Sequence, residues 1–416
     1  MIILPDRNVP RAKFLKPIST KQWRTPSHAQ KKNQLGNENH TRFKVEARLN
    51  DGHLVWRGWF DDRDDFDAFL WSMLNGTLAW ERPLWDLSTP SWYPGLGEHV
   101  TYYFVTVTYL TTAGSNQTYT FPGDWNGSSN TIEVIGAGGS GATLISVNQR
   151  GATGGGGGGY SLTNNVAKIT STATYFIGSG GAAVVQAPNV NAGTAGNAGG
   201  DTWFNNNGTV APASTTNGAL AKGGGGGVQA ATGAIAGGTG GASASGVGNT
   251  KASGGTGGPV TSLGVAACST GGGGAGGKTS SGNPGGTAAG STNVTTSGGS
   301  GDAGNGGAAG AAATVGGTVG GTGNGGAGGS GTEYSTSPQY GSGGGGGAGY
   351  PADGSSTTVT FGGNGGTYGA GGGGAVSRGS AITSGTGSQG FIVVTYTPSS
   401  STLGVNVPQF FTFCFS

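Results

Sequence analysis

Cysteine, charge and long apolar runs are all scarce in this 416-residue chain, and each shortage excludes a class of protein. The two cysteines, Cys268 and Cys414, are too few for a disulfide framework or a cysteine-rich metal site. Charged residues make up 9% of the chain and the formal net charge is +2, so charge does not favour nucleic acid as a partner. No segment approaches the roughly 20 apolar residues of a membrane-spanning helix, and we expect no membrane insertion.

Catalytic side chains are also few beyond residue 110. Histidines stand only at positions 28, 40, 53 and 99, without metal-binding or catalytic spacing. General acid–base chemistry needs a base within reach of its target, and the acids after residue 110 show no spacing that pairs them. They are Asp124, Glu133, Asp201, Asp302, Glu333 and Asp353. We therefore expect no enzyme, no catalytic residue, no cofactor and no metal ligand.

Glycine is abundant, and its uneven distribution divides the chain. Of 95 glycines only 7 lie in residues 1–114, whereas residues 1–110 hold 26 of the 38 charged side chains. Two differently built parts therefore meet near residues 111–116. The predicted organisation is an extended basic arm at 1–35, a small α+β domain at 36–114, a glycine-rich domain at 115–398 and a hydrophobic tail at 399–416.

The N-terminal part is predicted to be a small α+β domain that follows a docking arm. Residues 1–35 combine prolines with lysine and arginine and show no periodicity, so this arm can pack only along another surface. Its candidate docking residues are Arg11, Lys13, Phe14, Trp23 and Arg24. Alternation in 41–49 and a turn at 50–52 predict a β-hairpin that ends near residue 60. The acidic run at 61–65 favours a helix start, and further strands are expected near 77–85 and 99–110.

The glycine-rich part has two physical outcomes. The 88 glycines after residue 114 lose much backbone freedom on folding, so the glycine-rich segment either stays a flexible linker or packs as extended threefold glycine helices whose backbones approach closely. Apolar segments placed between the glycines favour order, because a linker does not need them. The segments are 117–121, 131–135, 174–178, 201–204 and 391–397. The predicted fold is a β-framed sandwich of packed polyglycine II-like helices.

Two glycine motifs match nucleotide-binding patterns. Residues 131–143, "TIEVIGAGGSGAT", contain G-x-G-x-x-G, but a glycine hexad replaces the required helix and the next acid is Asp201. Residues 272–279, "GGGAGGKT", match the P-loop pattern, yet the helix-breaking "SSGNPGG" follows. We attribute both matches to composition. The motif "GNGG" also recurs, at 304–307, 323–326 and 363–366, with spacing too irregular for a solenoid.

The order of these blocks resembles a known family. "TIEVIGAGGSGA", "GGGGGGYS", "TYFIGSGG", "GGDTWF" and the closing "GSQGFIVVTYT" are similar to the glycine-rich domain at the ends of bacteriophage tail fibres and adhesins. The resemblance covers residues 115–398. It implies a virion protein, made in the bacterial cytoplasm, in which polyglycine helices form a sandwich and loops recognise a host glycan or outer-membrane protein. It also implies attachment to other virion proteins through the N-terminal domain, in a homo-oligomer.

Aromatic segments between glycine runs are the candidates for receptor contact, because aromatic rings stack on sugar faces. The candidates are Tyr334, Tyr340, Tyr350, Tyr368 and Trp203, with plugging of the β frame as the alternative role for each. Phe411, Phe413 and Phe415 alternate in the tail, which is expected to pair with the N-terminal domain or another subunit. A head fibre, decoration or tail structural protein without receptor binding is the alternative function.

Overall fold

The chain divides into two compact units in the computed structural model. One comprises Met1–Tyr109, Pro122–Asn130 and Val394–Ser416, and the other comprises Leu110–Phe121 and Thr131–Val393. The structure describes residues 105–145, 151–188, 192–230, 233–263, 268–290, 294–313, 323–349, 360–377 and 379–399, together with strands β1 (Ile2–Leu4), β2 (Arg42–Leu49) and β3 (Leu54–Phe60).

Strands dominate the described residues. The helices assigned there are two short 3-10 segments, η6 (Ser243–Ser245) and η7 (Gly301–Gly304). No helix within these ranges is long and apolar enough to cross a membrane. The described part of the chain is therefore β-rich, as the sequence predicted for the glycine-rich domain.

In the first unit, β2 pairs in parallel with β1 and antiparallel with β3 and with β4 (Val105–Leu110). The β2–β3 pair confirms the hairpin predicted from alternation. β26 (Phe391–Tyr396) stands between β4 and β6 (Asn130–Ile135) in the order of hydrogen-bonded strands. The predicted helix after the hairpin, the strand near 77–85 and the aromatic tail lie outside the described residues.

Apolar strands frame one end of the second unit. β9 (Tyr160–Asn164) pairs antiparallel with β6 and with β16 (Thr250–Ala252). A second, antiparallel sheet has the order β14 (Gly218–Ala221), β13 (Thr202–Asn205), β10 (Thr172–Phe176) and β5 (Gln117–Thr120). Tyr119, Phe121 and Phe204 meet edge to face in its core. β5, β6, β10, β13 and β26 confirm the strands predicted from the apolar segments.

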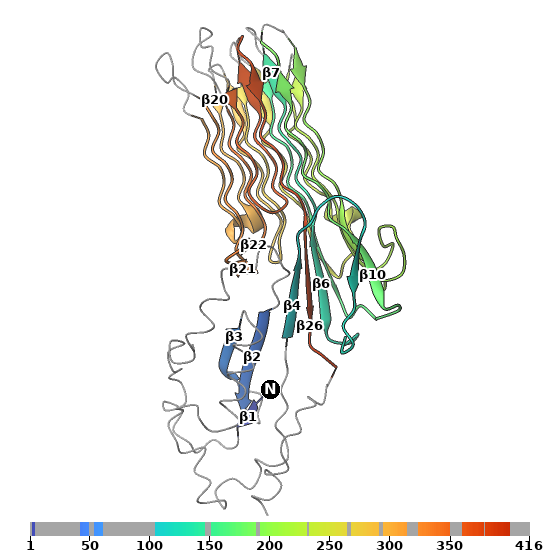
Figure 1. The fold of residues 1–416 in the computed structure, drawn as a ribbon. Coiled ribbons are helices and arrows are strands. Elements are labelled where there is room, and N and C mark those ends of the chain that lie inside the picture. The colour runs from blue at the N-terminus through green and yellow to red at the C-terminus, as the bar shows by residue number, and fades with distance from the viewer. Residues whose placement is uncertain are drawn as a thin grey trace, which may run out of the picture. The chain divides into compact units, whose positions relative to one another are not determined.

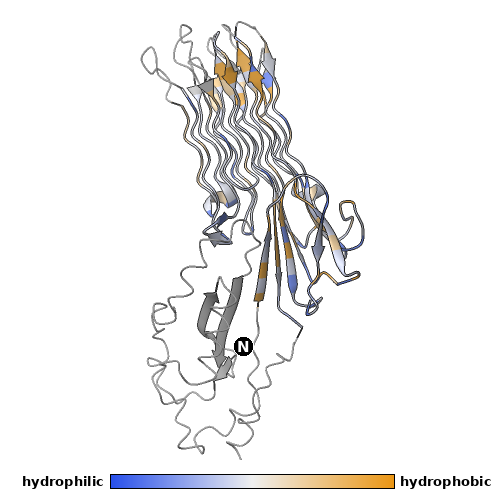
Figure 2. Cartoon of the chain, viewed as in Figure 1, coloured by the Kyte–Doolittle hydropathy of each residue, from blue (hydrophilic) through white to orange (hydrophobic). Residues whose placement is uncertain are grey.

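Small sheets close the other end of this unit (Figure 1). One holds β12 (Gly193–Thr194), β7 (Thr143–Ile145) and β24 (Ala375–Ser377), and another holds β15 (Gln229–Ala230), β8 (Gly151–Ala152), β18 (Cys268–Ser269) and β20 (Val294–Thr295). The others are β11 (Val185–Gln186), β25 (Ile382–Thr383) and β23 (Thr360–Phe361), and β17 (Val260–Leu263) with β19 (Ala288–Gly290). Leu144 packs with Val376, and Ile145 packs with Ile382. Figure 2 shows this apolar end, which anchors the glycine-rich segments between the sheets.

Glycine-rich segments run side by side between the two ends, mostly without strand or helix (Figure 1). In segment 153–159, every third backbone N–H group donates to the same neighbouring segment. On one neighbour, the N–H groups of Thr153, Gly156 and Gly159 donate to the carbonyls of Val228 (2.9 Å), Gly225 (2.8 Å) and Lys222 (2.9 Å). On another, those of Gly155 and Gly158 donate to the carbonyls of Gly372 (2.9 Å) and Gly369 (2.6 Å). The backbone direction of segment 153–159 therefore repeats every three residues.

The carbonyl groups of segment 153–159 follow the same repeat toward further segments. On one segment, the N–H groups of Gly238 and Gly241 donate to the carbonyls of Gly154 (2.9 Å) and Gly157 (2.8 Å). On another, the N–H groups of Gly273 and Gly276 donate to the carbonyls of Gly155 and Gly158 (both 2.9 Å). Segment 153–159 is thus surrounded by hydrogen-bonded backbone. Backbone groups satisfied in this way remove the penalty of burying them without side-chain partners.

The central glycines leave no room for side chains. A Cβ atom at Gly154 would overlap the carbonyl oxygen of Gly271, and one at Gly158 would overlap that of Gly136. Because backbone atoms obstruct both positions, side-chain rearrangement cannot make space. Glycine is required here for close approach, which explains the glycine hexad at 154–159.

Outer segments carry one exposed residue in every three. Thr256 is exposed between two pairs of buried glycines, 254–255 and 257–258. The exposed residues of segment 361–367 are Phe361, Asn364 and Thr367, and those of 236–242 are Ala236, Thr239 and Ala242. A local X-G-G triplet in the sequence therefore marks a surface segment, whereas uninterrupted glycine marks the interior.

The recurring "GNGG" motif forms a two-bond clamp at two of its positions. Asn324 Oδ1 accepts the N–H of Phe361 (3.0 Å), and the next residue, Gly325, donates to the carbonyl of that same Phe361 (3.0 Å). Asn364 and Gly365 hold Thr386 in the same way, at 3.0 and 2.9 Å. These Asn–Gly clamps fix the registers of neighbouring outer segments.

Candidate functional site

Three of the predicted receptor-contact tyrosines meet around Phe391, the first residue of β26. The ring of Tyr368 stacks on Phe391 with centroids 4.7 Å apart, and Tyr340 stacks on it at 5.3 Å. Tyr334 lies at 5.9 Å with its ring tilted by 59°. Phe391 is fully buried, whereas the three tyrosines are half-buried, so the cluster has an interior face and a solvent face.

A short hairpin carries two of these tyrosines. β21 (Ser335–Thr336) pairs antiparallel with β22 (Gln339–Tyr340), at the end of the second unit opposite β7 (Figure 1). Burial raises the pKa of Tyr340. Burial, followed by repulsion from the negative charge of an ionised Tyr340, raises the pKa of Tyr368 to about 12. Both phenols are therefore neutral and able to donate hydrogen bonds at physiological pH.

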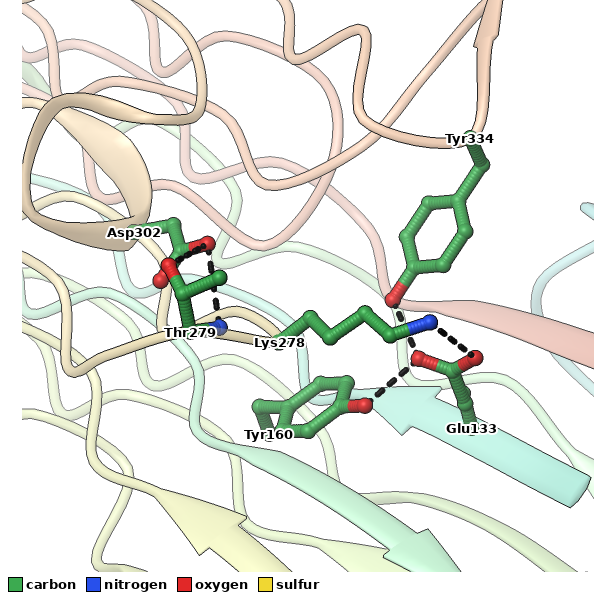
Figure 3. A network of polar contacts seen from close by, with 6 residues as sticks. All are labelled: Glu133, Tyr160, Lys278, Thr279, Asp302 and Tyr334. Atoms are coloured by element: carbon green, nitrogen blue, oxygen red, sulfur yellow. Dashed lines mark hydrogen bonds and ion pairs between the residues drawn. The ribbon is translucent and has the colours of Figure 1, made fainter. Parts of the chain in front are cut away.

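The buried carboxylate of Glu133 links this hairpin to the frame (Figure 3). Glu133, in the middle of β6, is 4% exposed, and its Oε2 accepts hydrogen bonds from the hydroxyls of Tyr160 (2.5 Å) and Tyr334 (2.8 Å). Lys278 Nζ lies 3.5 Å from Oε1. Burial, followed by the negative charge of Glu133, raises the pKa of both tyrosines. Their phenols remain donors, as a buried acceptor requires.

The P-loop-like segment binds a carboxylate of its own chain. The fully buried Asp302 accepts from the backbone N–H and hydroxyl of Thr279 (3.2 and 2.7 Å) and from those of Ser280 (2.5 and 2.9 Å). Figure 3 shows Lys278 extending away from this contact, toward Glu133. Lys278 and Thr279 are exposed, but the lysine and hydroxyl groups that a nucleotide site would present already contact carboxylates of the same chain.

The dinucleotide-like glycines serve close packing. A Cβ atom at Gly136, Gly138 or Gly141 would overlap backbone atoms of segments 222–223, 369–370 and 373–374 respectively. β7 follows at residue 143, in the place where the dinucleotide fingerprint needs a helix. These observations agree with the compositional interpretation of the motif.

A third acid, Glu333, adjoins the tyrosine hairpin. Its carboxylate accepts from the backbone N–H of Ser342 (3.1 Å) and from the Ser342 hydroxyl. Burial raises the pKa of Glu333, although the hydrogen bonds from Ser342 oppose that rise. Among the described residues, no group of three or more His, Cys, Asp or Glu side chains is arranged to hold a metal ion. The acids at this end therefore act as internal hydrogen-bond acceptors.

The other predicted site residues lie elsewhere. Trp203 is 7% exposed and stacks on Phe176 at 6.1 Å, as the frame-plugging alternative describes. Tyr350 and the docking residues Arg11, Lys13, Phe14, Trp23 and Arg24 lie outside the described residues. Receptor contact and docking at these positions stay predictions.

Sequence reasoning missed Phe391 and the partners of Glu133. One local signal was available: Glu133 is the single charge within the apolar strand "TIEVI", and a charge at such a position needs a buried partner. Nothing in the sequence links it to Tyr334, which is 201 positions away.

Comparison with known proteins adds no relative. No protein-family model matches this chain, and none of the curated proteins compared with it matches.

Proposed function

We propose that this chain is a bacteriophage virion structural protein, a tail fibre, spike or adhesin. In this proposal the arm and domain at 1–114 attach to the particle, and the glycine-rich domain recognises the host surface. The observation that carries it is the backbone hydrogen-bond lattice around segment 153–159, because it supports a rigid slab built almost without charged or bulky side chains.

We further propose that the glycine-rich segments are polyglycine II-like helices. A helix of this type makes one turn about every three residues, so residues three apart face one neighbour. The bonds from Thr153, Gly156 and Gly159 to a single segment support this geometry. Amide hydrogen exchange tests it: 153–159 should exchange far more slowly than an unstructured peptide, and exchange as fast as that peptide would exclude a rigid slab.

The tyrosine cluster around Phe391 is the part of the candidate receptor surface that the structure describes. Half-buried aromatic rings offer contact area with little loss of conformational freedom, which suits a glycan or an outer-membrane protein as ligand. Tyr340 and Tyr368 are the candidates to test first, because their half-buried rings stack directly on Phe391. Substituting Tyr340→Ser should weaken adsorption of virions to host cells, with Tyr119→Phe as the matched aromatic control.

Location on the particle is tested directly by immunogold microscopy. Antibodies raised against the full chain should label fibres or spikes of purified virions, and labelled virions should lose adsorption when the antibody is in excess. Absence of label from virions would refute the virion assignment.

A purely structural protein of the head or tail is the second candidate. It is favoured by the internal engagement of Glu133, Tyr334 and Asp302, which points to fold maintenance at the end that carries the tyrosines. In that case labelled particles would adsorb normally with the antibody bound or with Tyr340→Ser in place.

A further inference from the structure

Asn–Gly pairs recur through the described residues and differ sharply in their surroundings. They begin at Asn126, Asn207, Asn217, Asn305, Asn324 and Asn364. An asparagine followed by glycine is chemically labile because glycine has no Cβ to shield its nitrogen. That nitrogen attacks the asparagine Cγ and loses its proton, ammonia leaves, and the resulting succinimide takes up water to give aspartate or isoaspartate.

This reaction needs a free glycine nitrogen and a side chain that can rotate toward it. The Asn–Gly clamps at Asn324 and Asn364 oppose both movements. Each asparagine oxygen accepts from a neighbouring segment, and the following Gly325 or Gly365 N–H donates to the same residue of that segment. Both bonds must open before the ring can close, so the outer segments are protected.

The remaining pairs, apart from Asn207–Gly208, are also held. Gly306 donates to the carbonyl of Gly301 (3.1 Å), and Asn305 Nδ2 donates to Thr279 (2.9 Å). Gly218 is buried in β14, opposite Asn205 of β13. Asn126 Oδ1 accepts the N–H of Ser128 (2.9 Å), and Asn126 is half-buried.

Asn207 and Gly208 form the pair, among those described, in which both residues are exposed. The chain is anchored on each side of them: the Asn207 N–H donates to Asn205 Oδ1 (2.9 Å), and the Thr209 carbonyl accepts from Asn116 (2.9 Å). In this described loop the Asn207 side chain and the Gly208 N–H make no hydrogen bond. The reacting atoms thus lie in a short exposed stretch between two fixed points.

We propose that Asn207 is the position, among the Asn–Gly pairs of the described residues, at which the native chain deamidates. The product places a new carboxylate, and in the isoaspartate form an extra backbone carbon, in the exposed loop between β13 and β14. The net charge falls by one from the formal +2. The hydrogen-bond lattice around 153–159 is not involved, so the modified chain keeps its fold. This inference does not depend on the proposed virion function.

The experiment follows every Asn–Gly pair in one sample. The full-length chain is incubated at mildly alkaline pH, where the glycine nitrogen loses its proton more readily, and is then mapped by peptide mass spectrometry over time. Asn207 should accumulate aspartate and isoaspartate on the order of tenfold faster than Asn324 or Asn364, because the clamps of those two must open first. In a denaturing concentration of guanidinium chloride, the three positions should react at similar rates.

Two outcomes would overturn the proposal. One is modification of Asn324 or Asn364 at the Asn207 rate in the native chain. The other is an Asn207 that reacts in denaturant but stays intact in the native chain. The variant Asn207→Gln, whose longer side chain closes its ring much less readily, should lose the product at this position and leave the other positions unchanged.

Discussion

Replacing Gly157 with alanine tests whether backbone packing holds the glycine-rich unit together. A Cβ atom there would overlap the carbonyl group of Gly274, which accepts from the N–H of Gly255 (2.8 Å), while the N–H of Gly274 donates to the carbonyl of Asn283 (2.9 Å). Extra methyl groups in packed interiors cost about 1–3 kcal/mol, and we expect the upper end because backbone is obstructed. Lower entropy of the unfolded chain returns about 0.4–1 kcal/mol. The net expected loss of stability is about 2 kcal/mol.

Urea unfolding of the full chain, with amide exchange of residues 153–159, measures this effect. Two substitutions serve as controls: Gly123→Ala, because a Cβ atom there meets nothing within 4 Å, and Thr256→Ala, at an exposed triplet position. Each should change stability by less than about 0.5–1 kcal/mol. If Gly157→Ala left the urea midpoint and the exchange as unchanged as these controls do, close backbone packing would not be the source of stability.

Three further predictions concern the polar end of the same unit. Tyr160→Phe should destabilise the fold by about 1–3 kcal/mol, because the buried Glu133 loses a hydrogen-bond donor. Tyr334→Phe should destabilise it by less, since the 2.5 Å bond from Tyr160 to Glu133 stays intact. The urea midpoints of the two variants measure this difference in stability. Asp302→Asn should lower thermal stability by a similar amount, because an amide nitrogen replaces one acceptor facing Thr279 and Ser280; an unchanged melting temperature would contradict this. The raised pKa of Tyr368 means that its stabilising contribution is full below about pH 10 and is lost as the pH rises toward about 12. The absorbance of its tyrosinate form should therefore rise together with unfolding in that pH range. Titration of Tyr368 near pH 10 would instead show that its phenol is exposed.

The strands of the frame could be predicted because their signal is local. Alternation in 42–49 and the apolar segments at 131–135 and 391–397 depend only on adjacent residues, and β2, β6 and β26 stand there. The interior and surface glycine segments could also have been separated locally, by contrasting uninterrupted glycine with X-G-G triplets. A strict glycine period along the whole chain does not reveal this difference.

The candidate site was predicted in its residue types and missed in its arrangement. Tyr334, Tyr340 and Tyr368 were chosen as aromatic residues between glycine runs, and the structure brings them together on Phe391. Their shared partner, Phe391, belongs to β26, a strand that the sequence predicted only as part of the β frame. Lys278 and Glu133 illustrate the same limit, because a pair 145 positions apart leaves no local pattern.

The sequence by itself determined that side chains could not fill the interior of residues 115–398, since glycine there is too abundant and charge too rare. It also determined where the framing strands lie. Only the tertiary structure decided which segments are neighbours, because glycine backbones carry no side chains by which one segment could specify another. Register therefore comes from the few side chains that remain, the Asn–Gly clamps, the Glu133 network and the apolar sheets at each end, and these meet only when the whole unit has folded.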